Sequence, residues 1–291
     1  MSNTLTTLEH VKGSALTVTP STPTIGAEIS GVDLRDPLSP ELSAELREVL
    51  VRYKVLFFRN QEIDTGQQVA LARNFGSILF LPGTHDAHPE YPGVQVITNK
   101  EKSLRSDNSR EEWHIDCSGL IISPCATILR AVTIPPVGGD TIWANLAAAY
   151  EGLTDELKQT IDGLYLTQGQ MNFFRERGVE YPRLSHPIVR THPKTNEKVL
   201  YINFLSRPWV ADPPWVTGWS PEKSTELIRQ LKEEAIRPEY QVRFRWSTGA
   251  IAVWDNRAVH HYAVNDYDDF PRRMERILVA EPLPTLFEQL L

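Results

Sequence analysis

Long apolar runs are missing from this sequence of 291 residues, so no segment is predicted to span a bilayer. The first fifteen residues also lack the basic start and apolar block of a secretory signal. The only two cysteines, Cys117 and Cys125, match no thiolate metal spacing, and a structural disulfide is not expected. Basic residues are too few for nucleic acid, with 30 against 37 acidic and a net charge of −7. These absences predict a cytoplasmic protein that binds neither nucleic acid nor a membrane.

Internal repeats and low-complexity segments are absent as well, while the apolar fraction of 41% is ample for a substantial core. Because all-β barrels and sandwiches reach this length as one unit, residues 1–291 are expected to form a single domain. The start of the chain, residues 1–15 and the threonine- and proline-rich stretch up to about 24, is expected to be a flexible arm. Residues from about 168 to 219 are rich in proline and aromatic side chains, and they are expected to be an insertion that covers one end of a barrel.

Local patterns predict strands mixed with a few helices. Ser39-Pro40 and Ser220-Pro221 are typical helix starts, because serine caps a helix and proline is favoured in its first turn. Two further helices are expected, one from about 67 to 74 and one across 153–164 that opens at Thr154. Strands are expected where apolar residues run together or alternate, at 54–59, 126–132, 141–143, 249–257 and 272–279.

One imidazole and one carboxylate lie two residues apart at His114 and Asp116, so in an extended segment both side chains point to the same side. They make two thirds of the two-histidine, one-carboxylate set that holds non-haem Fe(II) and leaves coordination positions open. A second histidine must then come from far along the chain. His260 and His261 are candidates, but neighbours on a strand face opposite ways, so only one of them can bind. The spacing does not say which.

Two arginines are placed to form a cationic wall on the last expected strand. Arg272 and Arg276 are four residues apart, so both project to one face together with Met274. Ile277 and Val279 face the other way. Two guanidinium groups on one wall suggest a binding site for an anion.

Several motifs, in the same order along the chain, resemble those of the taurine dioxygenase-like Fe(II)/2-oxoglutarate-dependent oxygenases. They extend over nearly the whole chain from about residue 15: Gly26-Ala27-Glu28-Ile29-Ser30-Gly31-Val32, His114-Ile115-Asp116, Pro136-Val137-Gly138-Gly139-Asp140-Thr141, His192-Pro193-Lys194-Thr195, Trp254-Asp255-Asn256-Arg257, His261 and Arg272 to Arg276. The resemblance implies a mainly β fold with flanking helices, the double-stranded β-helix or jelly roll. It also implies a homo-oligomer, either a dimer or a tetramer.

The resemblance also assigns a metal centre. His114, Asp116 and His261 correspond to the catalytic residues that bind Fe(II), whereas His260 corresponds to a position that does not bind iron. This assignment agrees with the limit of one inward-facing histidine.

Binding sites for the organic molecules are implied in the same way. Thr141 and Arg272 match positions that hold the far carboxylate of 2-oxoglutarate, where a planar guanidinium can form two parallel charge-assisted bonds. Arg276 matches a position that faces the substrate anion in members that act on sulfonates or sulfates. Phe174 and Phe204, from the expected insertion, are predicted to contact the substrate.

The implied reaction consumes O₂ and 2-oxoglutarate, releases succinate and CO₂, and hydroxylates an unactivated C–H bond of a small, acidic, partly hydrophobic molecule, with or without collapse of the product. Asp116 favours hydroxylation over chlorination, since related halogenases lack this carboxylate. An alkyl sulfate or sulfonate dioxygenase of sulfur scavenging is an alternative. Two other classes differ in their needs: a zinc hydrolase would not require Thr141 and Arg272 as a carboxylate clamp, and a non-catalytic metal sensor would not require a pocket for a C–H substrate.

Two departures from the taurine dioxygenase pattern predict that taurine is not the preferred substrate. In that enzyme type a histidine before a proline and an asparagine shortly before Trp-His hold the sulfonate. Here Leu81 precedes Pro82, and residues 110–112 before Trp113 are Arg-Glu-Glu. Large apolar side chains in the expected insertion favour a bulkier acid: Phe173, Phe174, Phe204 and Trp209.

Overall fold

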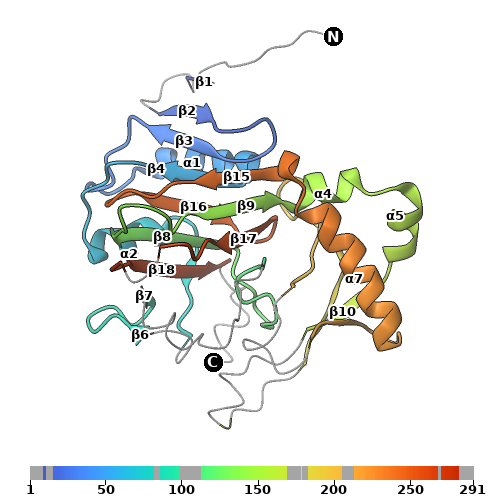
Figure 1. Ribbon diagram of the computed structural model, residues 1–291. Coiled ribbons are helices and arrows are strands. Elements are labelled where there is room, and N and C mark those ends of the chain that lie inside the picture. The colour runs from blue at the N-terminus through green and yellow to red at the C-terminus, as the bar shows by residue number, and fades with distance from the viewer. Residues whose placement is uncertain are drawn as a thin grey trace, which may run out of the picture.

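The computed structural model of the chain describes residues 9–10, 16–81, 86–98, 113–168, 178, 183–204, 213–267 and 270–281. Most of its strands belong to a larger sheet of ten strands and a smaller sheet of three. Figure 1 shows the two sheets together at the centre, with helices at the outside. The predicted jelly roll with flanking helices is thereby confirmed.

The larger sheet contains, in spatial order, β1 (Glu9–His10), β2 (Thr17–Pro20), β3 (Ala27–Ser30), β4 (Val55–Phe58), β16 (Ile251–Asp255), β8 (Ala126–Thr133), β18 (Arg273–Ala280), β7 (Val94–Thr98) and β6 (Asp86–Ala87), and β5 (Ser77–Ile78) pairs with β18. The smaller sheet contains β15 (Gln241–Phe244), β9 (Thr141–Asn145) and β17 (Val259–Ala263). Among the strands of the described residues, all pairs are antiparallel except β3 with β4.

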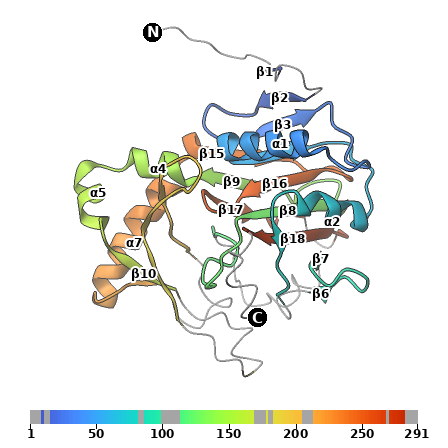
Figure 2. The same ribbon diagram turned by 180° about the vertical axis from the view of Figure 1, so that it is seen from behind.

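Helices cover the outer sides of the two sheets. Helices α1 (Pro40–Tyr53) and α2 (Thr65–Arg73) lie against the larger sheet, as the view from behind shows (Figure 2). Beside the smaller sheet lie α4 (Leu146–Gly152), α5 (Asp155–Ile161), α7 (Pro221–Ala235) and the short 3₁₀ helix η1 (Pro238–Tyr240). Short strands accompany them, in a three-stranded group of β10 (Tyr165–Thr167), β11 (Ser185–Pro187) and β14 (Trp215–Val216) and in a hairpin of β12 (Val189–Thr191) and β13 (Lys198–Leu200).

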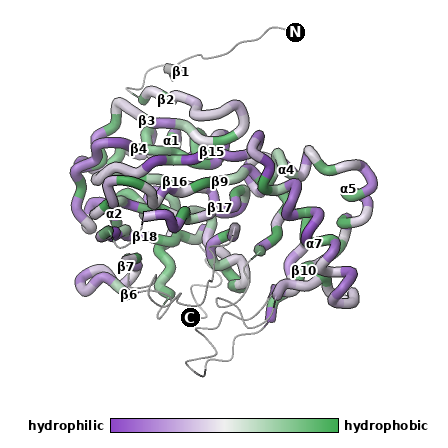
Figure 3. Tube along the Cα trace, viewed as in Figure 1, coloured by the Kyte–Doolittle hydropathy of each residue, from purple (hydrophilic) through white to green (hydrophobic). Residues whose placement is uncertain are grey.

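Within the part of the chain that the structure describes, this layering gives three apolar clusters. The cluster between the two sheets is aromatic and includes Phe57, Trp143, Phe244, Trp246 and Trp254. A second cluster lies between the larger sheet and helices α1 and α2, and a third lies between the smaller sheet and helices α4 and α7. Figure 3 shows the matching pattern along α7, where hydrophilic positions alternate with apolar ones. The first cluster, called the aromatic floor, borders the candidate site, because Trp254 packs against His261 and Trp246 donates to Thr141.

The helix starts were predicted correctly from the sequence. Ser39 and Ser220 each accept a hydrogen bond from a main-chain N–H three residues on, and Thr154 does the same for α5. The helix expected at 67–74 begins two residues earlier, because Asp64 forms a capping box with Gln67. The seven-residue helix α4, capped by Asn145, was not predicted.

The expectation that the flexible arm extends to about residue 24 is wrong, whereas the arm expected at residues 1–15 stays a prediction. Strand β2 pairs with β3, and Leu16 and Val18 are buried beside it. Residues 9 and 10 pair with β2. Residues 168–219 do carry the short strands β11 to β14, although parts of this stretch lie outside the described residues. In the described part of the chain, none of the helices is long and apolar enough to cross a membrane.

Candidate metal centre

His114, Asp116 and His261 come together at one end of the smaller sheet. His114 forms an isolated antiparallel bridge with His261 of β17, with main-chain N–H to O distances of 3.0 and 2.9 Å in the two directions. Each histidine Nε2 lies 3.9 Å from Asp116 Oδ1, and the potential ligand atoms of all three lie within 4.8 Å of one another. One side chain from each of three residues thus faces a common point.

Burial and charge put two of these groups in the forms that bind a cation. Burial alone raises the pKa of Asp116, but the charge of Arg276, together with the nearby histidines and the Thr127 hydrogen bond, outweighs it and holds the pKa at about 2. Burial, reinforced by the charge of His114, lowers the pKa of His261 well below its usual value. An ionised carboxylate and a neutral imidazole are the states that a divalent metal requires. The donor set therefore fits a non-haem iron ion.

His260 faces away from this point, as strand alternation requires. Its Nε2–H donates to the main-chain oxygen of Ile202, and its ring packs edge-on against Phe204 at 4.8 Å between centroids. Burial lowers the pKa of His260 to about 3. It is therefore a neutral core side chain of the third cluster.

The carboxylate of Asp116 is held at both oxygens. Thr127 of β8 donates to Oδ2 at 3.0 Å, and Arg276 of β18 donates through Nη1 to Oδ1 at 2.8 Å. The Nε of Arg276 donates to Gln95 of β7 at 2.9 Å. In the described part of the chain, the remaining nitrogen of this guanidinium, Nη2, has no hydrogen-bond partner. Arg276 thus presents a buried, positively charged donor beside the three-residue set.

Thr141 and Arg272 are the two residues expected to bind 2-oxoglutarate. Thr141 stands opposite Ala263 in the β9–β17 pair, two residues beyond His261 on the same face, or about 7 Å along the strand. Trp246 Nε1 donates to Thr141 Oγ1 at 3.0 Å. Arg272 lies over the ring of Tyr267 and donates through Nη2 to the carbonyl of Gly139 at 3.4 Å.

The turn before Thr141 leaves no room for a side chain. Gly138 and Gly139 both have positive φ, and a Cβ on Gly138 would lie 2.6 Å from the carbonyl oxygen of Asp266. A Cβ on Gly139 would lie 3.2 Å from Arg272 Nε. These glycines therefore let Arg272 approach the main chain two residues before Thr141.

The two predicted aromatic contacts have different outcomes. Phe174 lies outside the described residues. Phe204 is buried in the third cluster, between the ring of His260 and the ammonium group of Lys232. Both of these contacts belong to that core, so its role toward a substrate stays a prediction.

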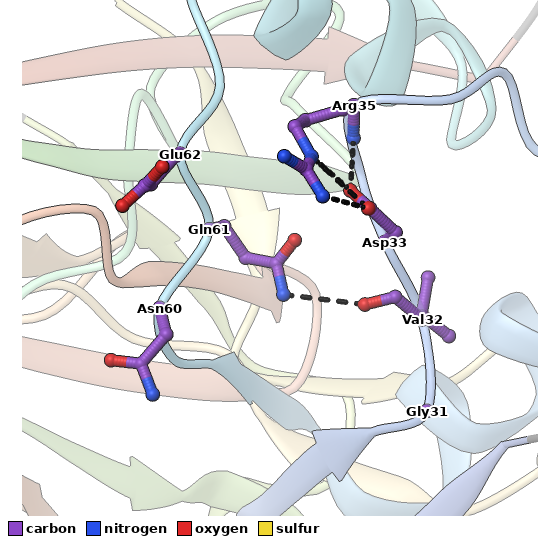
Figure 4. Close-up of a pocket in the computed structure, with 7 residues that line it drawn as sticks. All are labelled: Gly31, Val32, Asp33, Arg35, Asn60, Gln61 and Glu62. Carbon is purple, nitrogen blue, oxygen red and sulfur yellow. Dashed lines mark hydrogen bonds and ion pairs between the residues drawn. The ribbon is translucent and has the colours of Figure 1, made fainter.

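A hollow of about 470 Å³ lies elsewhere on the surface and is lined by Gly31, Val32, Asp33, Arg35, Asn60, Gln61 and Glu62. Figure 4 shows that Arg35 pairs with Asp33 and that Gln61 donates to the carbonyl of Val32. None of the potential metal ligands His114, Asp116 and His261 lines this hollow, so it is separate from the candidate metal centre.

Sequence reasoning missed three residues that hold the site: Thr127, Gln95 and Trp246. Thr127 and Gln95 lie in strands that the β18 and β8 pairings bring beside Asp116 and Arg276, and Gln95 stands opposite Arg276 in the β7–β18 pair. Neither strand shows a clear alternation of buried and exposed side chains that would mark these residues. The partner of each residue also depends on a strand register that local patterns do not contain.

Comparison with known proteins gives a consistent family. The model of the "Taurine catabolism dioxygenase TauD, TfdA family" matches residues 17–278. An alpha-ketoglutarate-dependent sulfate ester dioxygenase of Pseudomonas putida is 34% identical, over 92% of this chain and 91% of its own length. An alkylsulfatase of Acinetobacter baylyi is also 34% identical, over 90% and 84%. A crystal structure of a taurine dioxygenase from Burkholderia xenovorans superposes with a TM-score of 0.79 at 36% identity, over 93% of this chain and 91% of that one.

Proposed function

Because the chain belongs to the TauD, TfdA family and is an Fe(II)- and 2-oxoglutarate-dependent dioxygenase, we propose that it oxidises a sulfate ester of an aliphatic alcohol. The observation that carries this choice is Arg276, a buried guanidinium beside Asp116 with one nitrogen directed to no other described residue. An alkyl sulfate also has the acidic head and apolar body expected from the sequence. The names of the two relatives at 34% identity support the same class.

Three residues are proposed to hold the iron, namely His114, Asp116 and His261. When bound, the ion supplies the activation of O₂ that couples decarboxylation of 2-oxoglutarate to hydroxylation of a C–H bond. The protein contributes a carboxylate that stays ionised and imidazoles fixed by main-chain pairing. Thr127 keeps the second oxygen of Asp116 occupied, so that Oδ1 is the atom turned to the imidazoles.

The far carboxylate of 2-oxoglutarate is proposed to bind Thr141 and Arg272. Trp246 donates to the oxygen of the Thr141 hydroxyl, so the hydroxyl directs its own hydrogen elsewhere and can donate it to the co-substrate. The spacing of about 7 Å along the β9–β17 pair suits a five-carbon diacid that also reaches the iron.

The sulfate group of the substrate is proposed to bind Arg276, which Gln95 orients through Nε. This places the carbon next to the ester oxygen near the metal set. Hydroxylation there gives a carbon that carries both a hydroxyl and the sulfate oxygen. That product collapses when the C–O bond to sulfate breaks and the hydroxyl loses its proton, which releases an aldehyde and inorganic sulfate.

The test is a substrate panel scored for succinate and sulfate together. Linear alkyl sulfates of four to eight carbons, the matching alkyl sulfonates, an aryloxyacetate and taurine are incubated with Fe(II), 2-oxoglutarate and O₂. We expect an alkyl sulfate to give the fastest succinate release, with one sulfate per succinate, and taurine to rank below it. Faster turnover with taurine than with every larger acid would overturn this proposal.

Two further expectations belong to the proposal. A dimer or tetramer is proposed from the resemblance, and sedimentation or mass photometry at micromolar concentration tests it. A cytoplasmic location is proposed because both thiols, Cys117 and Cys125, are free, which suits a reducing compartment.

A further inference from the structure

The Trp254-Asp255-Asn256-Arg257 turn follows β16, and none of its residues belongs to the proposed ligand or co-substrate sets. Asp255 is fully buried and bonded to His192 at 3.0 Å and to Arg257 at 2.7 Å. Asn256 is also buried, with 1% of its surface exposed. Its side chain points in another direction, toward the segment that carries Asp116.

The amide of Asn256 makes three hydrogen bonds to main-chain groups. The N–H of Asp116 donates to Oδ1 at 3.0 Å, and Nδ2 donates to the carbonyl of Asp116 at 2.8 Å. Nδ2 also donates to the carbonyl of Pro124 at 3.1 Å, and the main-chain N–H of Asn256 donates to the carbonyl of Cys125 at 3.0 Å. One residue therefore ties the start of the 116–124 loop to its end.

The loop needs such a tie because its main chain turns sharply at the next residue. Cys117 has a φ of 48°, in the left-handed region that costs free energy for a residue with a Cβ. The regular bridge to β17 includes His114 and ends before Asp116. The N–H and carbonyl of Asp116 are therefore paired by a side chain and not by a neighbouring strand.

We propose that Asn256 is a positioning residue of the metal centre, which fixes the main chain of Asp116 so that its carboxylate meets the two imidazoles. A primary amide is suited to this role because it offers an acceptor and two donors in one plane. Thr127 and Arg276 touch the carboxylate itself, whereas Asn256 touches the peptide groups beside it. Its contribution is therefore to geometry and leaves the local charge unchanged. The proposal rests on the ligand role proposed for Asp116.

The test measures metal binding alone, in the absence of substrate. Asn256→Leu has nearly the same volume and removes all three side-chain hydrogen bonds, and Asn256→Ala removes them while leaving space for water. Co(II) is titrated anaerobically into each folded variant, and its visible absorption reports affinity and coordination geometry. We expect both variants to bind Co(II) about 10- to 100-fold more weakly, the scale seen when groups that orient metal ligands are removed, with a changed spectrum.

The matched control is Asp255→Asn at the preceding position. It weakens the contacts with His192 and Arg257 but leaves the amide of Asn256 in place, so we expect a lower melting temperature with unchanged Co(II) affinity and spectrum. If Asn256→Leu does not fold, Asn256→Ala decides.

Each outcome has a separate meaning. Unchanged Co(II) affinity and spectrum in a folded Asn256 variant would overturn the positioning role. An equal loss of affinity in Asp255→Asn would do the same, because the effect would then follow general destabilisation. If the unaltered protein fails to bind Co(II), the proposed ligand set itself is wrong.

Discussion

The two faces of the larger sheet carry buried arginines whose guanidinium groups are paired in different ways, Arg130 of β8 on the outer face and Arg276 of β18 on the inner face. On the outer face, Arg130 pairs with Glu275 at 2.6 Å and donates further to Gln68, Thr65 and the carbonyl of Ile63. On the inner face, Arg276 follows directly after Glu275 and pairs with Asp116 and Gln95.

This contrast separates a structural charge from a binding one. Every nitrogen of the Arg130 guanidinium has a partner in the protein, so that ion pair locks α2 to the larger sheet. Arg276 keeps a nitrogen with no partner among the described residues, beside three groups that can hold a metal. A buried guanidinium that keeps an N–H donor without a partner in the protein is suited to bind an anionic ligand.

The largest expected effect contrasts the two faces of β17. His261→Ala should lower metal-dependent succinate formation at least about a hundredfold, since removing a ligand costs more than removing a group that orients one. His260→Ala should instead lower the melting temperature and leave bound iron near the level of the unaltered protein. Iron content of the purified proteins after anaerobic loading checks both. Equal loss of iron in the two variants would contradict the assignment of His261.

The second prediction exchanges each arginine for methionine. Arg130→Met should lower the free energy of unfolding by about 1.5–3 kcal/mol, because the buried carboxylate of Glu275 loses its 2.6 Å bond to Arg130 and keeps only the bonds from Arg273 and Thr65. Its KM values should not change. Arg276→Met should raise KM for the alkyl sulfate about 10- to 100-fold and leave KM for 2-oxoglutarate unaltered.

Urea denaturation and steady-state kinetics on the same preparations decide this pair. A raised substrate KM in Arg130→Met, or none in Arg276→Met, would remove the distinction between the two faces.

Sequence patterns predicted which residues of β18 share a face, but not which side chains those residues contact. Strand alternation placed Met274 and Arg276 together and Ile277 and Val279 opposite them, and the core clusters show this division. The spacing of His114 and Asp116 predicted that both side chains converge on one point. The choice of His261 over His260 came only from the resemblance.

The parts that were missed depend on contacts between distant segments. Gln95 meets Arg276 through the β7–β18 register, 181 residues apart, and no local pattern predicts that pairing. Helix α4 is seven residues long and rich in alanine, too short for a clear amphipathic repeat. Strand β2 is a different case, because its partner β3 is close in sequence and its Thr-Val-Thr residues favour a strand, a signal that the prolines of the stretch outweighed in the prediction.

The third prediction concerns acid stability and the buried Asp255. Burial raises its pKa, but the hydrogen bonds and charges of Arg257 and His192 outweigh this and hold the pKa at about 2 in the folded state. The folded value lies below the unfolded one, so the carboxylate stabilises the fold above pH 4. About 2 kcal/mol of that stabilisation is lost as the pH falls from about 4 to about 2.

Asp255→Asn should therefore unfold more easily at pH 7 and depend less on pH in that window. Urea midpoints between pH 2 and pH 7 measure the effect. If the urea midpoints of the two proteins change in parallel with pH, Asp255 is not the source of the acid sensitivity.

The smallest expected effect concerns the hydrogen bond between Trp246 and Thr141, next to the site proposed for 2-oxoglutarate. Trp246→Phe keeps an aromatic ring in the central cluster and removes the hydrogen bond to Thr141, which is 3.0 Å long. A neutral hydrogen bond contributes about 0.5–1.5 kcal/mol, so KM for 2-oxoglutarate should rise about 2- to 12-fold.

Arg272→Ala, in comparison, should raise KM for 2-oxoglutarate by one to two orders of magnitude, because a charged hydrogen bond to the co-substrate is lost.

Phe244→Leu is the matched control for Trp246→Phe. Phe244 stands edge-on to Trp246 at 5.0 Å, so this change loosens the same cluster without touching the hydroxyl of Thr141. If the hydrogen bond orients the hydroxyl toward the co-substrate, only Trp246→Phe raises KM for 2-oxoglutarate, and KM for the alkyl sulfate stays constant in both variants. A similar rise in both would mean that packing of the aromatic floor, and not the direction of one hydroxyl hydrogen, sets the affinity for 2-oxoglutarate.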